Sequence, residues 1–288
     1  MDRAASSRPD YIAQRLETSF GVIERPLTPW QRIANSPWFR KGAILIVIAL
    51  GWQLYATRLG NPFVLPTFTA TTEAFLKSIA SGELLARTAY SIEVLLVGYA
   101  AGLALAAVLT ALAATTRLGR DLLELLSAML SPMPAIALLP LAMIWFGLGL
   151  GSFVFVLIHS VLWAVALNTN AGFRSVPNAL RMVGANYGLR GLHYIVLILV
   201  PAAFPSILTG LRIGWAFAWR TLIAAELVFG VSSQAGGLGW FIFEKKNMLD
   251  IPTVFAGLFM VIAVGLIIEY LVFGFVERRT IRKWGMQQ

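Results

Sequence analysis

The most restrictive feature of this 288-residue sequence is a run of 49 residues, Leu125 to Phe173, that contains no aspartate, glutamate, lysine or arginine. One helix crosses the hydrocarbon core of a bilayer with about 20 residues, so this run is long enough to cross and return. The whole chain is 58% hydrophobic and only 13% charged, whereas a soluble domain carries about a quarter charged residues. The sequence therefore predicts an all-α integral membrane protein.

Apolar segments separated by polar or glycine-rich loops predict six membrane-spanning helices. A polar tail, 1–40, is expected before a membrane domain, 41–277, and a basic tail, 278–288, after it. The apolar residues of 69–79 recur at helical spacing and predict a short surface helix between the first two spans. The six spans are expected at about 42–57, 91–114, 123–146, from the glycine hairpin 147–151 to 168, 204–229 and 252–275.

The net charge of +9 is distributed as a topology signal. With six spans, 16 of the Lys and Arg residues lie on one side and five on the other, and basic loops are retained in the cytoplasm. Both termini and the segment 170–193 are therefore predicted to be cytoplasmic. Binding to nucleic acid is not expected, because the basic residues mark loops and tails that flank apolar spans.

Three prolines interrupt the third predicted span: Pro132, Pro134 and Pro140. A proline inside a span frees backbone carbonyls that lipid cannot satisfy. The broken span is expected to face protein or a wet cavity, with Met133, Pro134 and Pro140 on its wall. The alternative is a simple kink buried between neighbouring helices.

Residues that could support catalysis or bind a cofactor are scarce. The chain has no cysteine, and His159 and His193 lack the spacing of metal ligands. His159 is predicted to be a buried hydrogen-bonding residue. A phosphate-binding loop with the pattern G-x-x-x-x-G-K-[ST] is absent, and Gly236–Gly239 is interpreted as a turn. We expect no enzyme activity, no metal and no cofactor in this chain.

Two ionisable residues, Arg220 and Glu226, fall inside the fifth predicted span. Charges at membrane depth are costly, so they pair or line a pathway. Six residues of helix separate these two, so they do not face each other and each needs another partner. Arg220 is expected either to pair with a carboxylate such as Glu93 or to attract an anion in a translocation pathway that also contains Glu226.

A short helix is predicted on the cytoplasmic side between the fourth and fifth spans. Pro177 suits the first turn, 178–182 follow, and the helix is expected to end near Gly184. Its small residues would allow close approach to a soluble partner.

This segment and several others resemble the permeases of binding-protein-dependent ATP-binding-cassette (ABC) importers, of the nitrate, sulfonate and taurine type. Those permeases carry an inner loop similar to E-A-A-x-x-x-G. The family's acidic residue is Asn178 here, its second alanine is Leu180, and the spacer from Gly184 to Pro201 is longer. The similar stretches are Asn178–Ala185, Val200–Pro205, Pro132–Gly151, Gly210–Gly214, Leu222–Leu227 and Gly236–Trp240.

The resemblance implies a six-helix permease bundle in a bacterial inner membrane that translocates a small, anionic solute and is itself no enzyme. The implied partners are a second permease copy (a homodimer), two cytoplasmic ATPase subunits that bind ATP and magnesium, a periplasmic or lipid-anchored solute-binding protein, and membrane lipid. An ion-coupled secondary transporter or a channel is the alternative. The resemblance assigns coupling to the ATPase to six residues: Asn178, Ala179, Leu180, Arg181, Gly184 and Ala185.

Overall fold

The computed structural model describes residues 35–229 and 236–280. The chain divides into two compact units, Met1–Ala49 and Leu50–Gln288, and every site considered below lies in the second. Apart from 35–40 and 278–280, the two predicted tails lie outside the described residues. The helices are α2 (Pro37–Leu59), α3 (Phe68–Ala80), α4 (Glu83–Thr115), α5 (Arg117–Leu130), η1 (Ala135–Leu138), α6 (Leu139–Phe146), α7 (Leu150–Ser175), α8 (Asn178–Asn186), α9 (Gly191–Tyr194), η2 (Ile195–Leu199), α10 (Val200–Ala202), α11 (Phe204–Phe229), α12 (Leu238–Asn247), α13 (Ile251–Ile267), η3 (Ile268–Phe273) and α14 (Gly274–Arg279).

The described residues form helices and no strand, which confirms the all-α membrane fold. Four helical stretches are long and apolar enough to cross a membrane, and the number rises to six if each of two bent pairs is one span. The bent pairs are α5 with η1–α6, at 88°, and α9–α10 with α11, at 82°. The predicted surface helix is α3, one residue longer at each end than expected.

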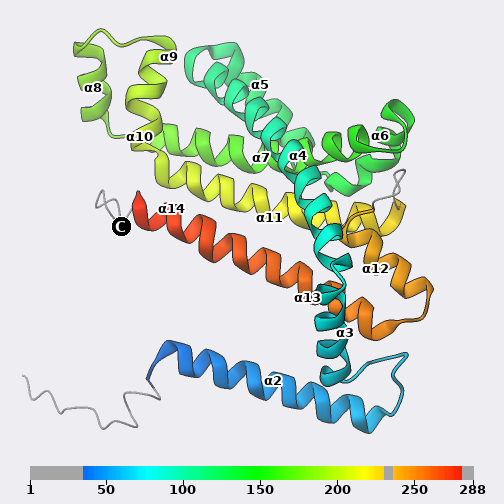
Figure 1. The fold of residues 1–288 in the computed structure, drawn as a ribbon. Coiled ribbons are helices and arrows are strands. Elements are labelled where there is room, and N and C mark those ends of the chain that lie inside the picture. Colours follow the sequence, from blue (N-terminus) through cyan, green and yellow to red (C-terminus); the bar gives the residue numbers. More distant parts are fainter. Residues whose placement is uncertain (1–34, 230–235, 281–288) are drawn as a thin grey trace, which may run out of the picture. The chain divides into compact units, whose positions relative to one another are not determined.

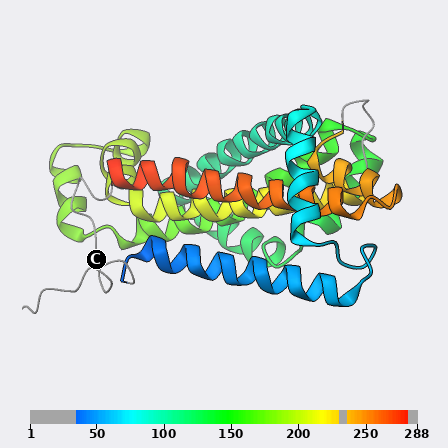
Figure 2. The same ribbon diagram turned by 60° about the horizontal axis from the view of Figure 1, so that its bottom comes forward.

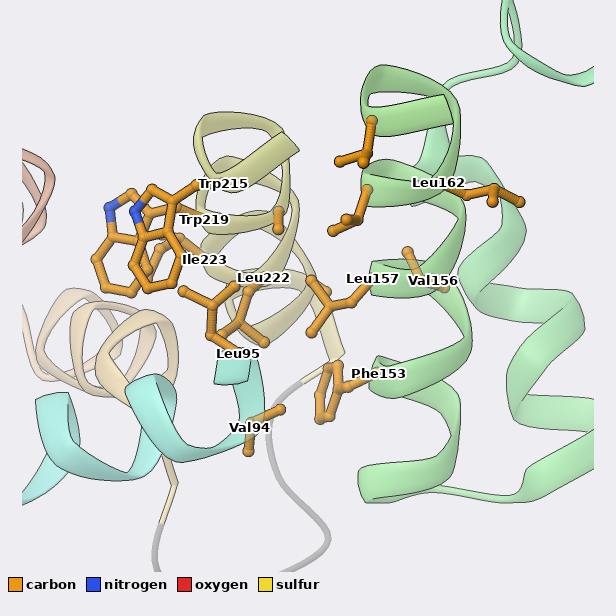
Figure 3. Packing of buried hydrophobic residues seen from close by; sticks show 14 of the residues in the cluster. Val94, Leu95, Phe153, Val156, Leu157, Leu162, Trp215, Trp219, Leu222 and Ile223 are labelled. Carbon is orange, nitrogen blue, oxygen red and sulfur yellow. The ribbon is translucent and has the colours of Figure 1, made fainter. Parts of the chain in front are cut away.

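The core forms where α7 packs between α4 and α11 (Figure 1). Small residues on α4 allow this contact: a Cβ added to Gly98 would lie 2.6 Å from the Cβ of Leu157, and one added to Gly102 would lie 2.7 Å from that of Val161. Glycine at this small-xxx-small spacing lets two helices approach closely. Figure 3 shows the apolar side chains that fill the junction, with Leu95 and Leu222 facing Leu157.

The ends of this bundle are built from different helices. At the α12 end, the N-terminus of α4 and the C-terminus of α11 meet α12. At the α8 end, the C-termini of α4 and α7 lie near α8 and α9. Figures 1 and 2 both show α11 and α13–α14 side by side along the bundle, and Arg212 of α11 joins them through ion pairs with Glu269 at 3.2 Å and Glu277 at 2.9 Å.

The predicted proline break is a sharp bend at residues 131–134. Pro134 has no N–H to donate to the carbonyl of Leu130 four residues earlier. His159 Nε2 on α7 donates to that carbonyl at 3.1 Å, and the N–H of Met133 also donates to it at 3.1 Å. The prediction that His159 forms a hydrogen bond is confirmed, although the residue is half-buried and not fully buried, and the bond ties the break to the core.

Candidate functional site

A cleft of about 600 Å³ opens beside the broken span, between residues 131–136, α7 and α11. Of the five predicted pathway residues, Met133, Pro134 and Arg220 line it, whereas Pro140 and Glu226 do not. Most of the wall is apolar, and its polar groups are few. The other lining residues are Ser131, Pro132, Ala135, Ile136, His159, Ser160, Trp163, Ala164, Leu167, Asn168, Ile213, Phe217, Thr221 and Ala224.

Several polar side chains of this cleft are held by bonds within or between the helices. Ser160 Oγ donates to Thr221 Oγ1 at 3.0 Å, which joins α7 to α11, and Asn168 Nδ2 donates to the carbonyl of Ala164 at 2.7 Å. The indole Nε1 of Trp163 has no hydrogen-bond partner among the described residues. The cleft therefore offers fixed polar groups on an apolar wall, the composition typical of a small-molecule pathway.

Arg220 is the charged residue of the cleft. Its side chain is exposed, its Nε donates to the carbonyl of Ala216 at 3.0 Å, and its guanidinium lies over the ring of Phe217, 5.1 Å from the centroid. In the part of the chain that the structure describes, no carboxylate forms an ion pair with it. The alternative in which Arg220 pairs with a carboxylate such as Glu93 is therefore not found.

Glu226 lies instead at the α12 end, where it is 1% exposed. Ser91 Oγ of α4 lies 2.8 and 2.9 Å from the two carboxylate oxygens and donates to them, and the N–H of Gly239 donates to Oε2 at 2.8 Å. Ser91 Oγ in turn accepts from the N–H of Leu238 at 2.7 Å. Glu226 and Ser91 thus accept the free N–H groups of Gly239 and Leu238 at the start of α12. We call this contact the Glu226 clamp, and it lies outside the cleft.

Gly237 and Gly239 are needed for this clamp, and the segment interpreted as a turn lies outside a helix only at Gly236 and Gly237. A Cβ on Gly237 would overlap the carboxylate of Glu226, and one on Gly239 would lie 2.6 Å from the carbonyl oxygen of Ile223. Leu238 and Gly239 already belong to the first turn of α12. The sequence signal for the clamp was a glutamate, Glu226, inside an apolar span, followed by the glycine-rich run 236–239.

The predicted coupling helix is α8, which extends to Asn186, two residues beyond the predicted end. Asn178, Ala179, Leu180 and Ala185 are exposed. Gly184 is buried, because its face packs on the segment that follows: a Cβ there would lie 2.9 Å from Tyr194 Cε2 and 3.2 Å from Ile198 Cγ1. Glycine is required here for contact inside the chain, which differs from the expectation that it makes room for a partner.

Arg181, also expected to face a partner, is bound to its own chain. Its guanidinium donates to the carbonyl of Phe173 at 2.6 Å and its Nε to that of Val176 at 3.1 Å. A cation at the C-terminus of a helix satisfies free carbonyls and favours the helix dipole. Arg181 therefore fixes α8 to the end of α7. The longer spacer after Gly184 contains the π-helix η2, and π-helical turns accommodate inserted residues.

A bundle of apolar helices with a cleft of a few polar groups beside a broken span, and a short helix outside the spans, is typical of a multi-pass membrane transport protein. The chain belongs to the family of binding-protein-dependent transport system inner membrane components, whose model matches residues 98–282. This family consists of transmembrane permease subunits. The match covers the cleft, α8 and, of the clamp, Glu226, Leu238 and Gly239, whereas Ser91 precedes it.

Three relatives illustrate the family. A putative ABC transporter permease of Methanocaldococcus jannaschii is 30% identical over 79% of this chain and 84% of its own length. A putative aliphatic sulfonates transport permease of Escherichia coli is 30% identical over 83% and 88%. A nitrate import permease of Synechocystis is 27% identical over 85% and 90%.

Proposed function

We propose that this chain is the permease subunit of an ATP-driven importer and that a small anionic solute passes through the cleft beside the broken span. The observation that carries the proposal is Arg220, a permanent cation that lies exposed in the cleft with no carboxylate partner among the described residues. A cation in a cleft that contains no opposing carboxylate concentrates anions near it. Two of the relatives are named as permeases for aliphatic sulfonates and for nitrate, and these anions agree with the charge of Arg220.

The ATP is hydrolysed by a separate ATPase subunit, which binds the nucleotide and magnesium, and α8 is the surface that docks on it. The apolar side chains of α8 support this role. Leu180 is 42% exposed and Met182 is 61% exposed, because no residue of the described chain covers them. Exposed apolar groups on a helix outside the spans favour a protein partner. A second copy of the chain and a solute-binding protein complete the proposed transporter.

Replacing Arg220 with glutamine tests the proposed pathway. The change removes the charge of the cleft, so uptake of the anionic solute by the assembled transporter should fall about tenfold or more, as for a lost charge-assisted hydrogen bond. ATP hydrolysis without solute should persist, because Arg220 supports no ion pair in the described structure. The matched control is Arg279→Gln, since Arg279 also lies over a phenyl ring, that of Phe275, but outside the cleft.

Wild-type uptake by Arg220→Gln would remove the cleft from the pathway. Uptake that continues after the ATPase subunit has been omitted would instead support the ion-coupled alternative. Both measurements use the same reconstituted vesicles, so a failure of assembly is recognised by the loss of ATP hydrolysis.

The proposed orientation places α8 and both termini in the cytoplasm of a bacterial inner membrane. The chain has no native cysteine, so Asn178→Cys introduces a single label site on α8. We expect a membrane-impermeant thiol reagent to react with it in inside-out vesicles and not in intact cells. Labelling from outside would contradict the orientation and the ATPase-docking role together.

A further inference from the structure

A second cleft, of about 470 Å³, lies at the α8 end of the bundle and shares no residue with the first. Three arginines from three helices converge on it: Arg120 of α5, Arg174 of α7 and Arg181 of α8. Asn170 and Tyr194 add polar groups, and no aspartate or glutamate lines the cleft. An adjoining cleft of about 440 Å³ shares Arg181 and adds Arg190.

The charge of this cleft is not neutralised within the described chain. Arg120 and Arg174 form no ion pair there, and their side chains donate no hydrogen bond within it. The neighbouring acids of α5, Asp121 and Glu124, are not part of the lining. Three like charges that converge repel one another, so their arrangement favours a bound anion.

Arg181 is the preorganised member of the group. Its two bonds to the carbonyls of Phe173 and Val176 fix the guanidinium at the end of α7, so little side-chain entropy is lost when a ligand binds. A guanidinium has five N–H donors, and donors remain after these two bonds. Arg120 and Arg174 line the same cleft, and both side chains are exposed.

We propose that this arginine cleft binds one phosphate-type oxyanion. Arginine forks match the paired oxygens of phosphate, and arginine cannot lose its charge to relieve the repulsion. The apolar part of the wall, which includes Ala113, Phe173 and Leu199, lies at the ends of the spans. The oxyanion is the phosphate of an anionic lipid headgroup or a free phosphate, and both would bind through the same three arginines.

The test uses the full-length chain in lipid nanodiscs and measures the thermal unfolding midpoint. A ligand that binds only the folded state raises the midpoint as its concentration increases. One arm places the chain in phosphatidylcholine and adds inorganic phosphate. The other arm uses phosphate-free buffer and replaces half of the phosphatidylcholine with phosphatidylglycerol. If inorganic phosphate raises the unfolding midpoint in the first arm, the bound oxyanion is free phosphate. If the midpoint rises only in the second arm, the oxyanion belongs to the lipid headgroup.

Arg120→Gln and Arg174→Gln, made singly and together, should each weaken this response about tenfold. Their midpoints in phosphatidylcholine without phosphate should equal that of the wild type, because neither side chain forms an internal bond in the described chain. The matched control is Arg117→Gln, which removes an exposed arginine of the same helix, α5, that does not line the cleft. A wild-type midpoint that is insensitive in both arms, or variants that respond like the wild type, would overturn the proposal.

Discussion

The α12 end and the α8 end of the bundle differ in whether their charged side chains form ion pairs. At the α12 end, Lys245 pairs with Glu83 at 3.1 Å and Arg87 pairs with Glu244 at 3.2 Å, while Glu226 binds Ser91 and the start of α12. At the α8 end, Arg120, Arg174 and Arg190 form no ion pair in the described parts of the chain.

The α12 end is therefore a fixed region, whose polar groups hold helices together, and the α8 end is a region whose groups can bind other molecules. Paired groups that satisfy one another across α4, α11 and α12 hold these helices together, so these groups are not available to a ligand. At the α8 end, the unpaired arginines and the exposed apolar side chains of α8 form no stabilising contact within the described chain. They are therefore available to bind groups outside it. Substitutions of the paired groups at the α12 end should therefore affect stability, and substitutions of the unpaired groups at the α8 end should affect interaction.

The largest effect is expected from Gly184→Trp, at the α8 end. The indole cannot fit against Tyr194 and Ile198, so α8 must leave its place and coupled uptake should be abolished. Expression and dimerisation should persist, because the core between α4, α7 and α11 is untouched. Uptake and ATP hydrolysis by the reconstituted transporter measure this effect.

Asn186→Trp is the control for that variant, since Asn186 is exposed at the end of the same helix. Solute-stimulated ATP hydrolysis that is normal in Gly184→Trp would remove α8 from the mechanism. Gly184→Ala should show a graded loss, because only small shifts of Tyr194 and Ile198 are needed.

The next effect is expected from Glu226→Ala, at the α12 end. The change leaves the N–H of Gly239 and the hydroxyl of Ser91 buried without their acceptor, and each such group costs about 1–3 kcal/mol. The free energy of unfolding should fall by about 3 kcal/mol, measured from the denaturation midpoint in detergent. Glu226→Gln keeps the shape and one acceptor oxygen, so it should lose less.

The same pair of variants separates the clamp from the pathway role first expected of Glu226. Lower stability with normal uptake per folded transporter supports the clamp. Normal stability with lost uptake would return Glu226 to the pathway and break the contrast between the two ends.

A smaller effect is expected from Arg181→Gln. Removal of the guanidinium frees the carbonyls of Phe173 and Val176 at the end of α7, and hydrogen bonds to a charged group contribute about 1.5–3 kcal/mol each when buried. Phe173 lines the arginine cleft, where water can replace part of the lost bonding, so a loss at the low end of this range, about 1.5 kcal/mol, is expected. The thermal midpoint measures it, and Arg190→Gln, which removes a neighbouring arginine without such bonds, should not change it.

The smallest effect concerns the exposed pair of Glu73 and Lys77 on α3, 2.6 Å apart. The hydrogen bond from Lys77, followed by its charge, lowers the pKa of the Glu73 carboxyl. A lowered pKa gives stability that is present above the unfolded-state pKa and is lost as pH falls through the folded-state pKa. Both side chains are exposed, at 75% for Lys77 and 66% for Glu73, and exposed pairs contribute little.

Glu73→Gln should therefore leave the thermal midpoint unchanged at neutral and acidic pH. A clear loss of stability at neutral pH that vanishes in acid would show that this surface pair contributes to the fixed region.

Local patterns were enough to predict most of the secondary structure. The charge-free run and the spacing of apolar segments located the spans, since each depends only on neighbouring residues. Proline at 134 predicted the break, because the missing N–H is a property of that residue alone. The sharp bends of 88° and 82° were not predicted, since a proline opens a helix without fixing its new direction.

By itself, the sequence determined that the chain is a helical membrane protein with a broken third span, a short helix outside the membrane and the features of an importer permease. Only the tertiary structure decided the partners of its charged residues. Arg220 and Glu226 lie on one helix, yet one faces a cleft and the other binds Ser91, 135 residues away. Composition and periodicity are local, whereas the partner of a buried charge depends on which distant helices pack against it. The same packing brought three arginines to one cleft and buried Gly184 inside the chain.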